Sequence, residues 1–431
     1  MTYGSNARVV VPGTASFRQA TRYDDAEEDT LSAADRMALF DRLTYFNRHY
    51  NSGCPQHDID RFSADWKLLL RADFSTKEMG EILRAVSDPL TQADWDNPDF
   101  YKGSRKTILE NWATWERDVL KNMRTARAGD AICVYNVCAA LRIKPSSELS
   151  SVVHNLVART AGVLKPPHFA KYLIASATLK DPVPSQHVLK LCTAIGRFSQ
   201  TMDKEGIRVL WAAAALHSLT GNEAYKKLAR SFKLPNIQDM PVTWQKMIYD
   251  AHSWFGWDSP VPNPNRETPV TSNTEKMLRA EFARCGFPTR EARFIPEFPN
   301  AIDFSLGADS GDVWIECDGP NHFLDNPMGR SFPHVYDGKT LFRAGLVQQV
   351  NQVGRILHAP FSVTDLILAK ATPFDAKKSM LEFLASAAKY MTAGSTALAD
   401  LRYDGEHIDM LMMPLEPGKG IGVPFAQMRV R

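Results

Sequence analysis

The sequence predicts a multidomain protein in which an N-terminal α-solenoid of helical hairpins is followed by a small α/β domain. From about Ser32 to Phe232, apolar residues recur at three- and four-residue spacing, which is typical of helices. A proline-rich segment then interrupts this pattern, and the short apolar runs beyond it indicate strands. The length of 431 residues leaves room for two or three domains.

Residues 1–31 are expected to form a disordered leader. The first 23 residues contain three arginines and no acid, a composition shared by organelle transit peptides and bacterial secretion leaders. An acidic run, DDAEED, follows from Asp24 to Asp29. A targeting role for the leader stays open, so the expected location is an organelle matrix or the bacterial cytoplasm, with a secreted effector as the further alternative.

The cysteines and the apolar runs indicate the redox compartment and whether a membrane partner is expected. Six cysteines fall at irregular spacings without a Cys-x-x-Cys pair, which argues against a disulfide scaffold or a zinc knuckle and favours a reducing compartment. The longest apolar run, VLWAAAALHSL, is too short to cross a bilayer, so no membrane partner is expected. The GKGIG run lacks the spacing of a phosphate-binding loop, and no small-molecule cofactor is expected.

Residues 32–256 are expected to form a helical-repeat domain. Three similar apolar runs end at Leu141, Leu179 and Leu216, at intervals of 38 and 37 residues, and each is followed by a break and a second amphipathic helix. A weaker copy begins at Asp73. A single hairpin would leave its apolar face in water, whereas alanine-rich hairpins stack closely, so the repeats predict a short solenoid.

The segments FSTKEMGEILRAVSD, KPPHFAKYLIASATL and MDKEGIRVLWAAAAL resemble the octotricopeptide repeat, a helical hairpin of proteins that bind organellar RNA. Leu210, Trp211, Ala212, Ala214 and Leu216 match its first-helix pattern best. The resemblance implies that single-stranded RNA lies along the array. By analogy with modular repeats, residues near the start of each first helix would contact bases, and the candidates are Asn136, Lys171 and Arg208.

Charge in this region is compatible with that partner. From Ala128 to Asn236 the chain has 14 Lys or Arg against 6 Asp or Glu, although the whole protein carries a formal charge of only +2. Such a local excess favours a polyanionic partner, and the open alternative is that these charges are solvated helix faces. Trp211 is expected to belong to the core instead of stacking on a base.

Residues 257–271 are expected to be a proline-rich linker, and residues 272–370 an α/β domain. A capping signature from Ser272 to Glu275 predicts a helix through Phe282. The runs FIPEFPNAIDFSL and DVWIECDG predict consecutive strands, TLFRAGLVQQV predicts a helix, and RILHAPF predicts a further short strand. The remaining residues, 371–431, are expected to form a C-terminal helix followed by an irregular tail.

Three carboxylates are expected to meet at the ends of these strands. Glu316 and Asp318 lie on one face of their strand because successive side chains alternate. Asp303 ends the preceding strand and lies beside Glu316 if the two strands pair. Because adjacent carboxylates repel, the cluster predicts a divalent ion, Mg²⁺ or Mn²⁺, held by Asp303 and Glu316. Such an ion positions a phosphodiester and activates water.

The order of Asp303 and Glu316 resembles the PD-(D/E)xK nuclease superfamily, although Asp318 stands where that family usually has lysine. The end of this predicted strand resembles a motif of the RAP domain and of the very-short-patch-repair branch of nuclease folds. The residues that match are Glu316, Asp318, Gly319 and His322. The resemblance implies catalytic roles for Asp303, Glu316, Asp318 and His322, and the open alternative is a structural polar cluster in a domain that only binds RNA. Lys339 and Arg343, one turn apart at a helix start, are candidates for holding nucleic acid.

RAP domains commonly follow octotricopeptide or related helical repeats, so the two resemblances support each other. Together they predict an RNA-binding protein that acts in RNA processing, stability or translation. Two alternatives stay open. One is a metal-dependent endonuclease acting on RNA or DNA, and the other is a protein-binding solenoid, including a secreted bacterial effector.

Overall fold

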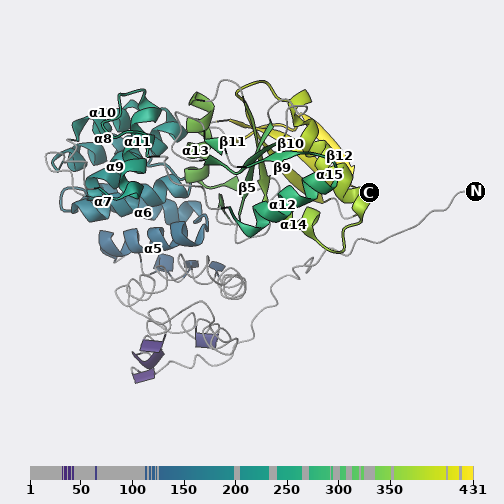
Figure 1. The fold of residues 1–431 in the computed structure, drawn as a ribbon. Helices are drawn as coiled ribbons and strands as arrows, with labels where there is room; N and C mark the ends of the chain where they lie inside the picture. The colour runs from purple at the N-terminus through teal and green to yellow at the C-terminus, as the bar shows by residue number, and fades with distance from the viewer. Residues whose placement is uncertain are drawn as a thin grey trace, which may run out of the picture.

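The protein is described by a computed structural model, shown in Figure 1. The described residues are 126–198, 204–232, 240–264, 271–291, 293–294, 301–306, 313–319, 322–324, 335–350, 354–403, 406–416 and 420–430, with scattered positions between 32 and 123. The predicted leader and the weak repeat copy that begins at Asp73 lie outside these residues. Helical and α/β parts are both present, as predicted.

The helical part is built from two layers of helices. One layer, hereafter the first-helix layer, contains α5, α7, α9 and α11, in which α7 packs against α5 and α9, and α9 also packs against α11. The second layer contains α6, α8 and α10. The bounds are α5 (Ala128–Leu141), α6 (Ser147–Thr160), α7 (Pro166–Thr178), α8 (Ser185–Gly196), α9 (Lys204–Thr220), α10 (Glu223–Ser231) and α11 (Val242–Phe255).

Small residues and polar caps explain these helices. Ala212 to Ala215 are fully buried, so α9 approaches both neighbours in its layer closely. Ser146 accepts a hydrogen bond from the Leu149 amide at the start of α6, and Asn222 caps α10 in the same way. Among the described helices, none is long and apolar enough to cross a bilayer.

The α/β part contains one large mixed sheet with the strand order β1-β4-β5-β8-β9-β10-β11, and β12 also pairs with β10. Strands β4 and β5 are antiparallel, whereas β5 and β8 are parallel and are joined through α13. The strand bounds are β1 (Thr289–Arg290), β4 (Phe304–Leu306), β5 (Val313–Asp318), β8 (Arg355–Pro360), β9 (Thr396–Tyr403), β10 (Ile408–Glu416), β11 (Gly420–Ile421) and β12 (Ala426–Val430).

Helices cover both faces of this sheet. Helix α13 lies between the sheet and the helical part, and α12, α14 and α15 lie with the sheet away from the helical part (Figure 1). The helix bounds are α12 (Asn273–Arg284), α13 (Gly338–Val350), α14 (Phe361–Leu368) and α15 (Phe374–Ala385), followed by the short turn η3 (Ser386–Lys389). Two small strand pairs, β2 (Arg293–Phe294) with β3 (Ala301–Ile302) and β6 (Phe323–Leu324) with β7 (Val335–Tyr336), flank the sheet.

The C-terminal segment differs from the predicted irregular tail. Residues from Thr396 onward form β9 to β12, which continue the same sheet from β8. Strand β10 is buried almost throughout, so it lacks the alternation of apolar and polar residues by which a half-exposed strand is identified. The predicted C-terminal helix is α15, which begins at Phe374 after Pro373 and ends at Ala385.

The predicted linker is partly packed against the helical part. Trp257 stacks on Phe255 with 4.6 Å between ring centroids, and Val261 is buried in the same core. Ser272 accepts a hydrogen bond from the Glu275 amide, which confirms the predicted cap of α12.

The two parts share one hydrophobic core. Phe342 of α13 lies 5.5 Å from Trp211 and 5.7 Å from Trp254, measured between ring centroids. Gly338, at the start of α13, approaches α7 so closely that an added Cβ would collide with the carbonyl oxygen of Ala177. Helix α13 therefore packs against both the sheet and the first-helix layer, and this position defines the surroundings of the predicted acids.

Candidate functional site

The three predicted acids come together on the sheet face that α13 covers. Strand β5 turns Ile315 toward α12 and α14, so Trp314, Glu316 and Asp318 lie on the opposite face. The Cys317 amide donates to Asp303 Oδ2 at 2.7 Å, and the Asp303 amide donates to Glu316 Oε2 at 3.3 Å. The order of strands expected from the sequence therefore brings Asp303 beside Glu316.

Burial and mutual repulsion raise the pKa values of two of these carboxyl groups, Glu316 and Asp303. Burial raises the pKa of Glu316 to about 7, with Asp303 and Asp318 adding to the increase and Arg343 opposing it. Burial also raises the pKa of Asp303, although the Cys317 amide opposes this. Near neutral pH, therefore, one proton or one added cation changes the charge of this cluster.

Asp318 behaves differently because two histidines face it. Burial alone would raise its pKa, but the charges of His358 and His322, with hydrogen bonds from His358 and Tyr336, hold the pKa below its ordinary value. His358 Nδ1 lies 2.6 Å from Asp318 Oδ2, and the Tyr336 hydroxyl donates to the same oxygen at 2.7 Å. Asp318 is therefore a fixed anion at the end of β5.

His322 is half-buried and lies near Asp318. Its Nδ1 atom is 3.3 Å from Asp318 Oδ1 and 3.2 Å from the hydroxyl of Thr340 on α13. The predicted catalytic residue is thus in contact with the acid cluster and with the first turn of α13.

Sequence reasoning missed His358 and Tyr336. Parallel pairing of β5 with β8 places His358 opposite Glu316, which depends on contact between segments 42 residues apart. A histidine in the otherwise apolar run RILHAPF was the one available signal. Tyr336 belongs to a two-residue strand, which leaves no periodic pattern to find.

Lys339 and Arg343, predicted as a pair, have different neighbours. Arg343 Nη2 lies 2.6 Å from Glu316 Oε1, so this guanidinium reaches the acid cluster. Lys339 instead interacts with Arg142 of the helical part and with Asp337, next to the start of α13. The charge of Asp250 of α11 also helps to raise the pKa of Arg343, so the acid cluster is coupled electrostatically to the first-helix layer.

The divalent ion predicted at Asp303 and Glu316 stays a prediction, and it would have to compete with the protein partners of Glu316. Both Glu316 oxygens have protein partners, namely Arg343 and the Asp303 amide. Within the described residues, no group of three or more His, Cys, Asp or Glu side chains has an arrangement suited to a metal. Arg343 supplies the positive charge that the sequence analysis assigned to Mg²⁺ or Mn²⁺.

Glu275 adds a fourth carboxyl group beside the cluster. This residue of α12 is 3% exposed, and its Oε1 atom has no hydrogen-bond partner. Burial raises its pKa to about 7, and the charge of Asp303 adds to the increase. The sequence favours a capping role for Glu275, with an acid of the nuclease-like site as the alternative, and the charge of Asp303 acts on its carboxyl group.

The predicted base-contacting residues lie on three first helices. Lys171 of α7 is exposed, whereas Asn136 of α5 is half-buried. Arg208 of α9 is 3.4 Å from Glu205, and its guanidinium lies over the Trp244 ring at 5.3 Å. Trp211 is 8% exposed and packs on Phe342, so it belongs to the core as expected.

Exposed charge on the helical part is strongly one-sided. Between 126 and 232, the described residues include ten exposed cations and two exposed acids, Glu148 and Glu223. Three of the cations occupy equivalent places at the starts of first helices: Arg127 before α5, Lys165 before α7 and Lys204 in α9. The others are Lys144, Arg159, Lys171, Lys190, Arg197, Lys227 and Arg230.

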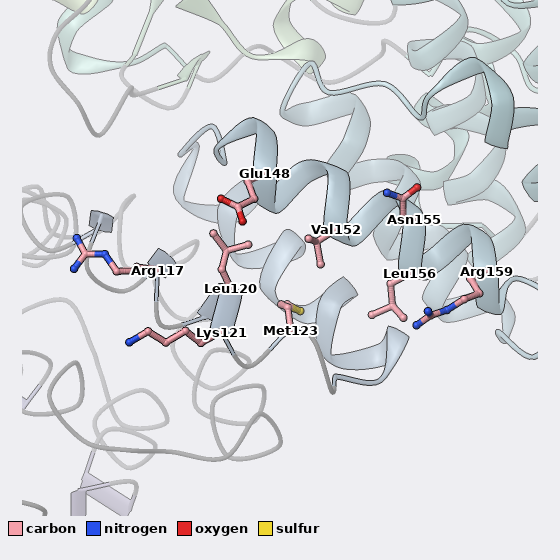
Figure 2. Close-up of a pocket in the computed structure, with 9 residues that line it drawn as sticks. All are labelled: Arg117, Leu120, Lys121, Met123, Glu148, Val152, Asn155, Leu156 and Arg159. Atoms are coloured by element: carbon pink, nitrogen blue, oxygen red, sulfur yellow. The ribbon is translucent and has the colours of Figure 1, made fainter.

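A cleft of about 660 Å³ opens at the N-terminal end of this surface, between residues 117–123 and α6 (Figure 2). Arg117, Lys121 and Arg159 lie around it, and Val152 and Leu156 are among its apolar walls. Its charge has the same sign as that of the neighbouring helices.

The chain matches no protein-family model and no curated protein.

Proposed function

We propose that this protein binds single-stranded RNA through its helical part and acts in RNA processing, stability or translation. The observation that carries this proposal is the excess of ten exposed cations over two exposed acids among the described residues between 126 and 232. A surface of this kind attracts a polyanion and releases its counterions on binding. Solvated helix faces usually carry both signs of charge, so the imbalance favours a ligand.

The arrangement of the helices supports an extended ligand. Each pair packs on the next, and we propose that the pairs form a short solenoid. Arg127, Lys165 and Lys204 then repeat along one edge at intervals of 38 and 39 residues, where helix N-termini also favour negative charge. A single strand with regularly spaced phosphates matches such a row better than a compact ligand does.

The α/β part has a supporting role in this proposal. Helix α13 covers part of the first-helix layer, and Arg343 pairs with Glu316. In this proposal, the α/β part is a RAP-like domain that holds the helices of the helical part in place and contacts RNA next to them.

The test is fluorescence anisotropy with a short labelled oligouridine and the full chain over a range of NaCl concentrations. The dissociation constant should rise steeply with salt, with a slope that falls by about 2 in Arg127→Gln/Lys165→Gln/Lys204→Gln if each cation contacts one phosphate. Absence of RNA binding by the wild type at low salt, or binding insensitive to salt, would overturn the proposal. The first of these results favours the protein-binding alternative.

The endonuclease alternative has one observation in its favour. Glu275, Asp303 and Glu316 all have raised pKa values, chiefly because they are buried, and neighbouring carboxyl groups perturbed in this way are typical of functional sites. Incubating labelled RNA or DNA with the protein and Mg²⁺ or Mn²⁺ tests this alternative. Cleavage by the wild type that is lost in Glu316→Gln supports it, and intact substrate in every reaction rejects it.

A further inference from the structure

Four cations gather where the two parts of the protein meet. Arg142 Nε lies 2.8 Å from Asp337 Oδ2, across the boundary between α5 and the α/β part. Lys339 interacts with both of these residues, and Lys180 interacts with Asp337 and with Lys144. The cluster, hereafter the junction cluster, consists of Arg142, Lys144, Lys180 and Lys339 around Asp337.

The repeat builds half of the junction cluster. Arg142 directly follows α5. Lys180, 38 positions later in the sequence, is the second residue after α7. Both have left-handed backbone conformations, with φ of 56° and 51°, in which residues other than glycine are uncommon. The same kind of turn therefore places a cation at the C-terminal end of two successive first helices.

Helix α13 supplies the other half. It starts at Gly338, whose contact with the Ala177 carbonyl brings Lys339 to the end of α7. Asp337 is 2% exposed and already has partners, since Arg142 pairs with it and its Oδ1 accepts the Thr340 amide. Asp337 is thus an already occupied carboxylate with which Arg142, Lys180 and Lys339 all interact, and Lys144 adds a fourth positive charge close enough to lower the pKa of Lys180.

This excess of charge is costly unless an anion offsets it. Burial, followed by the charge of Arg142, lowers the pKa of Lys339 to about 8. Burial and the charge of Lys144 lower the pKa of Lys180. The C-terminal ends of α5 and α7 offset only a fraction of a charge each. Lys144 is exposed and Lys180 and Lys339 are partly so, which leaves the cluster open to a ligand.

We propose that the junction cluster is a phosphate-binding site, which holds backbone phosphates of the RNA where the helical and α/β parts meet. The inference rests on the proposed function for the source of the phosphate. Arg142 is held in place by Asp337, and the three lysines act as point charges around it.

The position of the site connects it with the acid cluster. Lys339 and Arg343 are one turn apart on α13, a rise of about 6 Å. Between them, Thr340 lies 3.2 Å from His322, which contacts Asp318. A phosphate held by Lys339 therefore lies about one helical turn along α13 from Arg343, which pairs with Glu316 of the acid cluster.

The experiment compares two double variants of the full chain. Lys144→Gln/Lys180→Gln removes two charges from the junction cluster, and Lys190→Gln/Lys227→Gln removes two exposed lysines from the second-helix layer. With oligouridine, the first variant should lower the slope of log affinity against log salt by about 1.4, and the second should change it by less. Lys339→Gln provides a single-site check on the same slope.

The outcomes separate this inference from the proposed function. If the wild type binds oligouridine and both double variants have equal slopes and affinities, the RNA-binding proposal stands and the junction site is wrong. If the wild type does not bind oligouridine, the junction site is tested by measuring the Tm of each protein with and without sodium tripolyphosphate. A higher Tm in the wild type and control, but not in Lys144→Gln/Lys180→Gln, supports the site. Equal shifts in all three, or no shift, overturn it.

Discussion

Glu316 shows how the local environment of one side chain sets its charge. Strand alternation was sufficient to predict that Glu316 and Asp318 share a face, and strand order placed Asp303 beside them. The partner of Glu316 was not predictable in the same way, because Arg343 reaches it only after α13 packs on the sheet. A guanidinium and a divalent ion both offset the repulsion between neighbouring carboxylates, and the sequence alone does not distinguish them.

The Glu316–Arg343 pair leads to a prediction for stability. In Arg343→Gln, Glu316 loses its cation while it stays buried, so the free energy of unfolding at pH 8 should fall by about 3 kcal/mol. The loss should shrink toward pH 5, where Glu316 is protonated in the folded state. Urea denaturation at both pH values measures this.

The matched control is Arg343→Gln/Glu316→Gln, which removes both charges and should regain most of the lost stability at pH 8. An equal loss in the single and double variants would show that packing, and not the buried charge, makes Arg343 important.

Asp250 gives a second prediction with a defined sign. Burial raises its pKa to about 7, although a hydrogen bond with Trp211 and the charge of Arg343 oppose the increase. A carboxyl group with a raised folded-state pKa contributes stability at low pH, and this contribution is lost as pH rises from about 4 to about 7. Asp250→Asn keeps an acceptor for Trp211 without the charge.

Asp250→Asn should therefore be more stable than the wild type at pH 8, by roughly 1–3 kcal/mol, with the difference disappearing near pH 4. Denaturant unfolding across this pH range measures the difference. A variant that is less stable at pH 8 would show that the Asp250 charge is needed to balance Arg343.

At the scale of elements, α13 connects every feature of the site. Its first turn carries Lys339 and Thr340, its second carries Arg343, and Phe342 packs between Trp211 and Trp254. The sequence predicted the helix from its apolar spacing, but not that it would cover the first-helix layer. That contact depends on Gly338, whose fit against Ala177 leaves no periodic signal.

Gly338→Ala tests this contact. The added methyl group meets the backbone of α7, so the helix start must shift, at a cost of about 1–3 kcal/mol in the free energy of unfolding. Gly196→Ala, at the last residue of α8, is the matched control because nothing lies within 4 Å of its added Cβ. It should be neutral or slightly stabilising. Equal effects of the two substitutions in chemical denaturation would contradict the close approach.

The C-terminal strands could not be predicted from the sequence pattern. Strand β10 and the first half of β9 are buried between one cluster that contains residues of α12, α14 and α15 and another that contains residues of α13. A strand of this kind has no alternation, and its methionines favour no single secondary structure. Only its pairing partners identify it as part of the sheet.

At the scale of the whole molecule, one hydrophobic cluster spans the helical and α/β parts, and two further clusters of described residues belong to the α/β part. Residues of α9, α11, α13 and β5 belong to the same hydrophobic cluster. The change of pattern in the sequence predicted two parts but gave no information on their contact. That contact creates the junction cluster, which draws its cations from both parts.

The most direct test of the RNA-binding account is ultraviolet crosslinking of oligouridine to the full chain, followed by mass spectrometry of the linked peptides. Crosslinks should occur in peptides from residues 126–232 and at the start of α13, and they should weaken together as salt increases. Crosslinks confined to the outer helices α14 and α15 or to β12, or none at a salt concentration where anisotropy reports binding, would contradict it.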